Sequence, residues 1–195
     1  MSDAHANFWS PTLSPRPITV AVHQDHIEDL GEAWLADIAD RALAALALPD
    51  NSSMEVVVTD DETVRELNLR HRGLDETTDV LSFGPGLING LSPESAGANG
   101  DDGDGGFVLP PGSDEDASIG EVIISGPVSA RRAASNARET SEEVAFLLAH
   151  GILHLMGHDH EEPQERADME TEHRRLLIAM LGPTASSIPV EYPSS

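Results

Sequence analysis

The 195-residue sequence contains no cysteine. Disulfide bonds and thiolate metal ligands are therefore excluded, which leaves histidine and carboxylate side chains to bind any metal ion. No apolar stretch reaches the roughly 20 residues that a membrane-spanning helix needs. The N-terminus also lacks the basic start and the apolar run of a signal peptide. These absences predict a soluble, cytoplasmic protein with no membrane partner.

Basic residues are scarce as well. The sequence has 11 of them, all arginine, against 35 acidic residues, so its formal net charge is -24. A field of this sign repels nucleic acid at long range, which argues against a nonspecific phosphate-binding protein. Any contact with RNA must therefore be local.

The length and the residue patterns predict one domain of the α/β (α+β) class. Runs rich in β-branched residues indicate four strands, at 17–23, 54–59, 78–83 and 119–125. Between and after them, about five helices are predicted: 30–46, a short one capped by Asp60 or Asp61, one beginning at Pro127, one opening at Ser141 with acids in its first turn, and 163–181. These elements predict one mixed four-stranded sheet packed by helices, with a strand order that the pattern leaves open.

Composition divides the chain into four parts. Residues 1–16 are polar and proline-rich, and we expect a loose N-terminus. The domain itself covers 17–182 and includes an acidic Gly/Asp-rich insert at 84–117. This insert has too few apolar residues to offset the cost of ordering its backbone, so we expect a solvated loop. Residues 183–195 are expected to form a disordered tail.

The string AHGILHLMGHDH, residues 149–160, holds four of the nine histidines. His150 and His154 stand four residues apart, which places both imidazoles on one face of a helix. A third ligand must come from His158 or His160. A straight helix would carry His158 about 12 Å from His150 along its axis, too far to share one ion. A glycine at Gly157 can turn the chain back, and we favour His150, His154 and His160 as the ligands.

Three neutral imidazoles are the ligand count of a catalytic zinc site rather than of a closed structural site. Apolar residues surround the helix that carries the first two on every side, so this metal-site helix is expected to be central and buried. The spacing also matches the metallopeptidase pattern HExxHxxGxxH. Because Gly151 stands where that pattern has its glutamate base, a zinc peptidase is the alternative rather than the first choice.

Three motifs together carry a resemblance to a known family. They are HGILHLMGHDH, the upstream RELNLRHRGLDETTDVLSF, and IGEVIIS between them. In this order they resemble the YbeY family of bacterial rRNA maturation factors, over roughly residues 18–181 outside the acidic insert. The chain departs from the family's usual residues at Thr77, Gly84, Glu121 and His158, and its insert is longer than expected.

The resemblance implies a zinc-dependent endoribonuclease specific for single-stranded RNA. Such an enzyme would act in 3′-end maturation of 16S rRNA and in ribosome quality control, with the small ribosomal subunit and its assembly factors as partners. By this likeness His150, His154 and His160 bind one zinc ion, and Arg72 is the functionally important arginine. A non-catalytic assembly factor whose zinc only holds the fold is a further alternative.

Several polar residues near these motifs allow two interpretations each. Asp79 either orients a histidine or ends a turn. His158 either shuttles protons or is an exposed turn residue. Asp159 is expected to brace its turn through backbone hydrogen bonds. Three arginines either form a local groove for the RNA backbone or lie on a solvated helix face: Arg131, Arg132 and Arg138.

Overall fold

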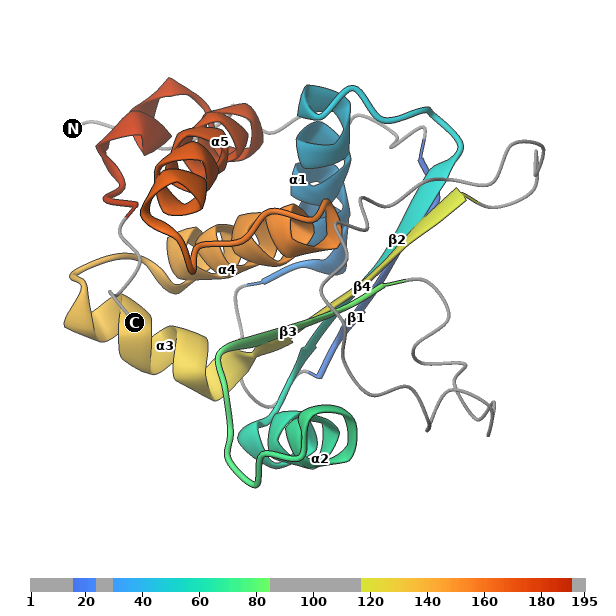
Figure 1. Cartoon of the computed structure of the whole chain (residues 1–195), viewed down its shortest axis with the longest axis vertical. Coiled ribbons are helices and arrows are strands. Elements are labelled where there is room, and N and C mark those ends of the chain that lie inside the picture. Colours follow the sequence, from blue (N-terminus) through green and yellow to red (C-terminus); the bar gives the residue numbers. More distant parts are fainter. Residues whose placement is uncertain (1–15, 24–29, 85–116, 191–195) are drawn as a thin grey trace, which may run out of the picture.

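The computed structural model describes residues 16–23, 30–84 and 117–190. Its elements follow one another in this order (Figure 1): β1 (Ile18–Val22), α1 (Glu32–Ala45), β2 (Ser52–Thr59), α2 (Asp61–Arg72), β3 (Val80–Phe83), β4 (Ala117–Ser125), α3 (Gly126–Ser135), α4 (Thr140–Leu155), α5 (Pro163–Leu181) and the 3-10 helix η1 (Pro183–Ser187). The predicted α/β class, with one four-stranded sheet and five α-helices, is confirmed. The predicted insert falls almost entirely outside the described residues.

The strands form one sheet in the order β1-β2-β4-β3. β1, β2 and β4 run parallel, whereas β3 pairs antiparallel with β4, so the sheet is mixed as predicted. β3 is an edge strand, and within the described part of the chain no other strand covers its outer side.

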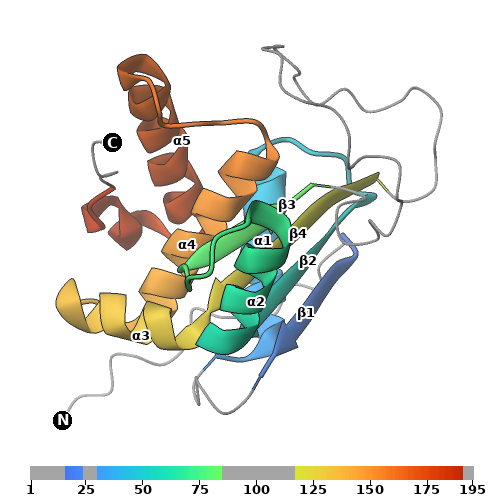
Figure 2. The same ribbon diagram turned by 60° about the horizontal axis from the view of Figure 1, so that its bottom comes forward.

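Helices α1, α4 and α5 lie on one side of the sheet and α2 lies on the other (Figures 1 and 2). Successive side chains of β2 point to opposite faces of the sheet. Met54, Val56 and Val58 enter the main core, whereas Val57 packs on the other face. A smaller cluster lies beneath α2 and contains Val64, Leu81, Phe83 and Ile123.

Helix α4 is the most deeply buried helix of the fold, with ten of its 16 residues buried. This burial follows from the apolar residues on all of its sides. α4 packs against β3, β4, α3 and α5, so the residues at its C-terminal end have a fixed position relative to the sheet edge. No helix within 16–23, 30–84 and 117–190 is long and apolar enough to cross a membrane.

The helix starts follow ordinary capping chemistry. Asp60 caps α2, and its Oδ1 accepts a hydrogen bond from the Thr63 N–H at 2.8 Å. The predicted start of α4 at Ser141 is slightly wrong, because the helix begins at Thr140 after Glu139. There the Glu139 N–H donates to the Glu142 carboxylate at 3.3 Å, as in a capping box.

Two predicted loose ends are partly ordered. Arg16 is 7% exposed, and its guanidinium pairs with Asp40 and Asp50, each at 2.9 Å. At the other end, the predicted disordered tail is wrong for residues 183–190. They contribute η1 and three buried apolar side chains to the main core: Ala185, Ile188 and Val190. Composition missed these contacts because the apolar residues are too widely spaced to form a periodic pattern.

A glycine sets how closely α4 approaches the sheet. A Cβ atom added to Gly151 would lie 2.7 Å from Val122 Cγ1 and 2.9 Å from Ser82 Oγ. Real Cβ atoms are not found this close to other heavy atoms, so the helix and the strands could not both keep their places. The residue that breaks the metallopeptidase pattern is therefore required by packing.

We expect Gly151→Ala to lower the free energy of unfolding by about 1–3 kcal/mol, because the extra methyl group overpacks the contact between α4 and the sheet. Urea or thermal denaturation would measure the loss. Gly84→Ala is the matched control, since a Cβ atom there meets nothing within 4 Å. Equal stability of the two variants would contradict this account of Gly151.

Candidate metal centre

The C-terminal half of α4 presents His150 and His154 side by side. Their Nε2 atoms lie 3.1 Å apart, and their ring centroids are separated by 4.5 Å. This is the contact that a spacing of four residues produces on one face of a helix. Both side chains are half-buried beside a tightly packed helix, so their positions are set before any ligand binds.

The chain reverses immediately after α4. Gly157 has a φ of 83°, in the left-handed region that favours glycine. The Gly157 N–H donates to the His154 carbonyl oxygen and the His158 N–H donates to the Leu153 carbonyl oxygen, both at 3.0 Å. These two bonds form a Schellman motif, which ends the helix and sends the chain back across its own end. The predicted break at Gly157 is confirmed.

The returning segment carries His160 to the pair on α4. Its ring centroid lies 5.5 Å from that of His150 and 5.3 Å from that of His154. The Asp159 carboxylate accepts the His160 N–H at 2.7 Å, so the predicted bracing role of Asp159 is confirmed. Arg166 of α5 donates to the His160 carbonyl oxygen from two of its nitrogens, at 3.2 and 3.1 Å. The N–H and the carbonyl oxygen of His160 are thereby both hydrogen-bonded.

The three histidines fit a metal ion as a donor set. One ring nitrogen of each of His150, His154 and His160 lies within 4.8 Å of the others. His158 does not join this group among the residues that the structure describes, which agrees with the choice of His160. Burial, followed by the neighbouring His154, lowers the pKa of His150 to about 2, and burial and His160 lower the pKa of His154. The imidazoles of His150 and His154 are therefore neutral at pH 7, the form that binds metals.

A fourth histidine, His173 of α5, lies directly behind the centre. It is fully buried, with its ring centroid 6.0 Å from that of His150 and 4.3 Å from that of Phe146. Its Nε2 lies 3.0 Å from the Phe146 carbonyl oxygen, in the helical turn that precedes His150. The sequence interpretation missed His173. Its place on the apolar stripe of α5, in step with Met169 and Leu176, was the available signal.

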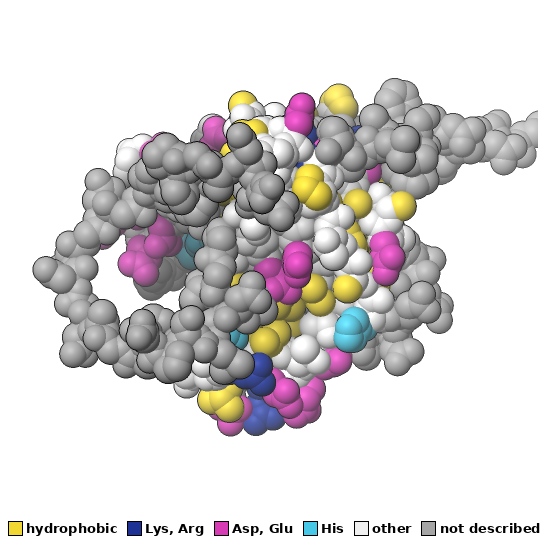
Figure 3. Space-filling view, turned by 90° about the vertical axis from the view of Figure 1, so that its right-hand side faces the viewer, with side chains coloured by type: hydrophobic (Ala, Val, Ile, Leu, Met, Phe, Trp, Pro, Cys, Tyr) yellow, Lys and Arg dark blue, Asp and Glu magenta, His cyan; other side chains and the backbone are white. Residues whose placement is uncertain are grey.

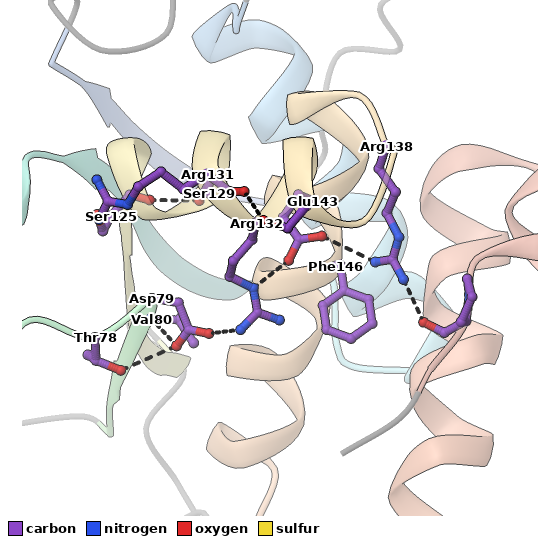
Figure 4. A network of polar contacts seen from close by, with 12 residues as sticks. Thr78, Asp79, Val80, Ser125, Ser129, Arg131, Arg132, Arg138, Glu143 and Phe146 are labelled. Carbon is purple, nitrogen blue, oxygen red and sulfur yellow. Dashed lines mark hydrogen bonds and ion pairs between the residues drawn. The ribbon is translucent and has the colours of Figure 1, made fainter. Parts of the chain in front are cut away.

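The polar residues of α3 and α4 form an internal network rather than an open groove (Figure 4). Glu143 is fully buried and accepts from Arg132 at 2.6 Å and from Arg138 at 3.2 Å. Arg132 also pairs with Asp79. Since a buried carboxylate needs cations, the helix-face and groove interpretations of these arginines are both incomplete. No contact of Asp79 with a histidine is found in the described part of the chain.

Arg131, the third arginine of the predicted groove, pairs with Asp61 of α2 at 2.9 Å. None of these three side chains is therefore spare for an external phosphate. Arg72 differs from them. It is exposed as the last residue of α2, and across 16–23, 30–84 and 117–190 it makes no hydrogen bond or ion pair.

Arg72 lies within electrostatic reach of the histidines. Its positive charge is one of the lesser causes that lower the pKa of His154. The adjacent His71 packs its ring against Phe83 of β3, with centroids 4.8 Å apart, which anchors the end of α2 on this strand. The structure therefore brings the predicted arginine and the three predicted histidines to one region, around the edge strand β3.

Comparison with known proteins identifies the family of the chain. The model of one protein family, described as Endoribonuclease YbeY, matches residues 18–180. A Dehalococcoides mccartyi protein named Endoribonuclease YbeY is 43% identical over 138 residues, covering 71% of this chain and 74% of the relative. A Symbiobacterium thermophilum protein of the same name is 37% identical over 151 residues, covering 76% of this chain and 86% of the relative.

One solved structure shares the fold. It is the solution structure of TM1509 from Thermotoga maritima, with a TM-score of 0.51 and 20% sequence identity. The match covers 90% of this chain and 99% of that one. At this identity the likeness supports the architecture alone.

We expect His154→Ala to lose its zinc, because the donor set falls from three imidazoles to two. Its affinity should fall by more than the roughly 10- to 100-fold that removal of a supporting group costs. Metal analysis after dialysis and competition with a chromophoric chelator would measure the change. His158→Ala is the control and should keep the wild-type metal content; equal loss in both variants would refute the ligand assignment.

The buried His173 also predicts a pH effect in chelator-treated protein. Burial lowers its pKa from 6.5 to about 4, so between these values the unfolded chain binds a proton that the folded chain does not. The free energy of unfolding should therefore decrease as the pH falls from 6.5 toward 4. His173→Gln should make this decrease shallower, by up to about 1.4 kcal/mol per pH unit. Urea denaturation at several pH values measures the slopes, and parallel slopes would contradict the expectation.

Proposed function

Because the chain belongs to the Endoribonuclease YbeY family, we propose that it is a metal-dependent endoribonuclease that cleaves single-stranded RNA. The observation that carries this proposal is the convergence of three imidazoles beside an arginine that makes no ion pair with the described residues. The family relatives named above are called endoribonucleases, which supports an RNA phosphodiester as the substrate. The cellular substrate is then 16S rRNA during maturation of its 3′ end.

His150, His154 and His160 would hold one zinc ion. When bound at such a site, zinc supplies Lewis-acid chemistry and activates water near neutral pH. The side chains hold their positions through packing and backbone hydrogen bonds, so binding costs little reorganisation. Imidazole donors also suit other transition metals, and the choice of zinc rests on the family likeness and on the ligand count.

Arg72 would bind the phosphate that reacts. A guanidinium is planar and permanently charged, and it can donate two parallel hydrogen bonds to the non-bridging oxygens of a phosphate. As negative charge gathers on these oxygens, the interaction strengthens, so Arg72 contributes more to the transition state than to the ground state. No carboxylate within 16–23, 30–84 and 117–190 pairs with this guanidinium, which favours a contact with the substrate.

The charge distribution confines RNA contacts to a small area. At least seven of the eleven arginines pair with carboxylates of the described residues: Arg16, Arg41, Arg65, Arg131, Arg132, Arg138 and Arg175. In Figure 3, acidic side chains are scattered over the face shown, and the most prominent arginines lie at its lower edge, the level of α2 in Figure 1. A small positive area on an acidic protein favours one short stretch of single strand.

The small size of this positive area also fits a role in the cytoplasm on the small ribosomal subunit. A protein that repels nucleic acid over most of its surface needs other contacts to reach its RNA. Assembly factors or subunit proteins would supply them. We therefore propose a role in 16S rRNA maturation and ribosome quality control, with these components as partners.

We expect Arg72→Ala to slow cleavage of a single-stranded RNA oligonucleotide by on the order of 10²- to 10³-fold, because a donor aimed at developing charge is lost. Zinc content should stay at the wild-type level. Single-turnover cleavage and metal analysis measure both quantities. Arg174→Ala is the matched control, since Arg174 is also exposed and makes no ion pair in the part of the chain described here.

Two results would change the assignment. If Arg72→Ala unfolds or loses its metal, Arg72 is structural. If the zinc-loaded protein cleaves casein but leaves single-stranded RNA intact, the peptidase alternative replaces the nuclease. His160→Ala tests the remaining alternative, a non-catalytic assembly factor whose zinc only holds the fold. A folded but inactive variant indicates a catalytic ion, and an unfolded variant indicates a structural ion.

A further inference from the structure

The open edge of β3 lies at the candidate metal centre, and its hydrogen-bonding pattern identifies the groups that face outward. The Ser125 N–H donates to the Asp79 carbonyl oxygen at 2.9 Å, so these two residues form a hydrogen-bonded pair. In an antiparallel ladder such pairs alternate with pairs that exchange no bonds. Leu81 therefore bonds to Ile123, whereas Ser82 opposite Val122 turns its N–H and its carbonyl oxygen away from β4.

Ser82 is then the outward main-chain donor of this strand that has no acceptor among residues 16–23, 30–84 and 117–190. The other outward N–H, that of Val80, is already bonded to the Asp79 carboxylate at 2.9 Å. An edge strand with a free N–H is a site at which a ligand oxygen can be bound without moving the backbone.

The side chain of Ser82 lies on the same side of the sheet as α4. Ser82 and Val122 are directly opposite one another, and both approach Gly151, where an added Cβ would lie 2.9 Å from Ser82 Oγ. Gly151 adjoins His150 in α4. The Ser82 hydroxyl is half-buried, and within 16–23, 30–84 and 117–190 it has no hydrogen-bond partner.

Arg72 reaches the same edge from the opposite side of the sheet. α2 covers that side, and the contact between His71 and Phe83 places its end on β3 one residue beyond Ser82. The histidines lie on the side of α4, where Gly151 next to His150 approaches Ser82. A phosphate that meets both Arg72 and the histidines must therefore pass the outer edge of β3 at Ser82.

We propose that Ser82 is a substrate-binding residue, whose hydroxyl and main-chain N–H donate to phosphate oxygens of a single RNA strand lying along the outer edge of β3. The proposal rests on the nuclease function proposed above and adds a contact to the same site. Ser82 complements Arg72 by binding the phosphate from the side of the sheet on which the histidines lie. Its two donors fix the orientation of the phosphate, whereas the guanidinium supplies charge.

The test compares two side chains of the same shape, Ser82→Thr and Ser82→Val, which differ in the hydroxyl group. Both add the same bulk beside Gly151, so a packing role affects them equally. We expect Ser82→Thr to stay within about 3-fold of wild type in kcat/KM for a single-stranded RNA oligonucleotide. Ser82→Val should fall by at least about 10-fold, the lower end of what one hydrogen bond to a charged group contributes. Zinc content and melting temperature should match between them.

Equal kcat/KM values for the two variants would overturn the proposal. If the added bulk unfolds both variants, Ser82→Ala replaces them as the test. Ser53→Ala, on β2, is then its control. A decrease of about 10-fold in kcat/KM for Ser82→Ala, but not for Ser53→Ala, supports the contact. Wild-type kcat/KM in Ser82→Ala overturns it. Wild-type protein that fails to cleave RNA refutes the proposed function and this inference together. Slow cleavage by Arg72→Ala alongside unimpaired Ser82 variants refutes the inference alone.

Discussion

The reversal of the chain at Gly157 is the constraint on which the candidate metal centre depends. An α-helix advances 1.5 Å per residue, so a third histidine can join His150 and His154 only if the helix ends within about one turn of the second. The Schellman bonds to Leu153 and His154 end it there. A residue with a Cβ atom would be strained at a φ of 83° by roughly 1–2 kcal/mol. The convergence of the three imidazoles thus depends on backbone geometry as much as on the histidines.

The other end of α4 is held by a buried charge. Glu143 has no exposed surface, and two arginines neutralise it, so loss of either cation would leave a partly unpaired carboxylate in the core. Arg132 extends the network to Asp79, the residue just before β3. One ion network therefore ties α4 to the strand that carries Ser82. Together with the bond between His173 and the Phe146 carbonyl oxygen, it keeps the histidines and the sheet edge in register.

The sequence predicted this fold well where local patterns decide it. β-branched runs and capping residues marked the elements to within a few residues. Helix geometry excluded a straight helix as far as His158, and the turn at Gly157 favoured His160, which lies beside His150 and His154. The strand order was not predictable, because it depends on pairing between segments far apart in the chain. The Glu143 network was missed for a related reason. Its members come from the residue before β3, from α3, from the segment between α3 and α4, and from α4. An acid near a helix start normally indicates a favourable helix dipole on the surface.

The arrangement of charge explains how so acidic a protein can act on RNA. Most arginines are consumed by internal carboxylates, which stabilise the fold but contribute nothing to a polyanionic substrate. Long-range attraction is therefore absent, and binding must arise from short-range contacts at the reacting phosphate. Arg72, the outward groups of Ser82 and the three histidines lie around one strand edge. In the proposed function each of them would act on the same phosphate. Contacts concentrated in this way act where charge develops during cleavage, so the binding energy that the acidic surface allows is directed at the transition state.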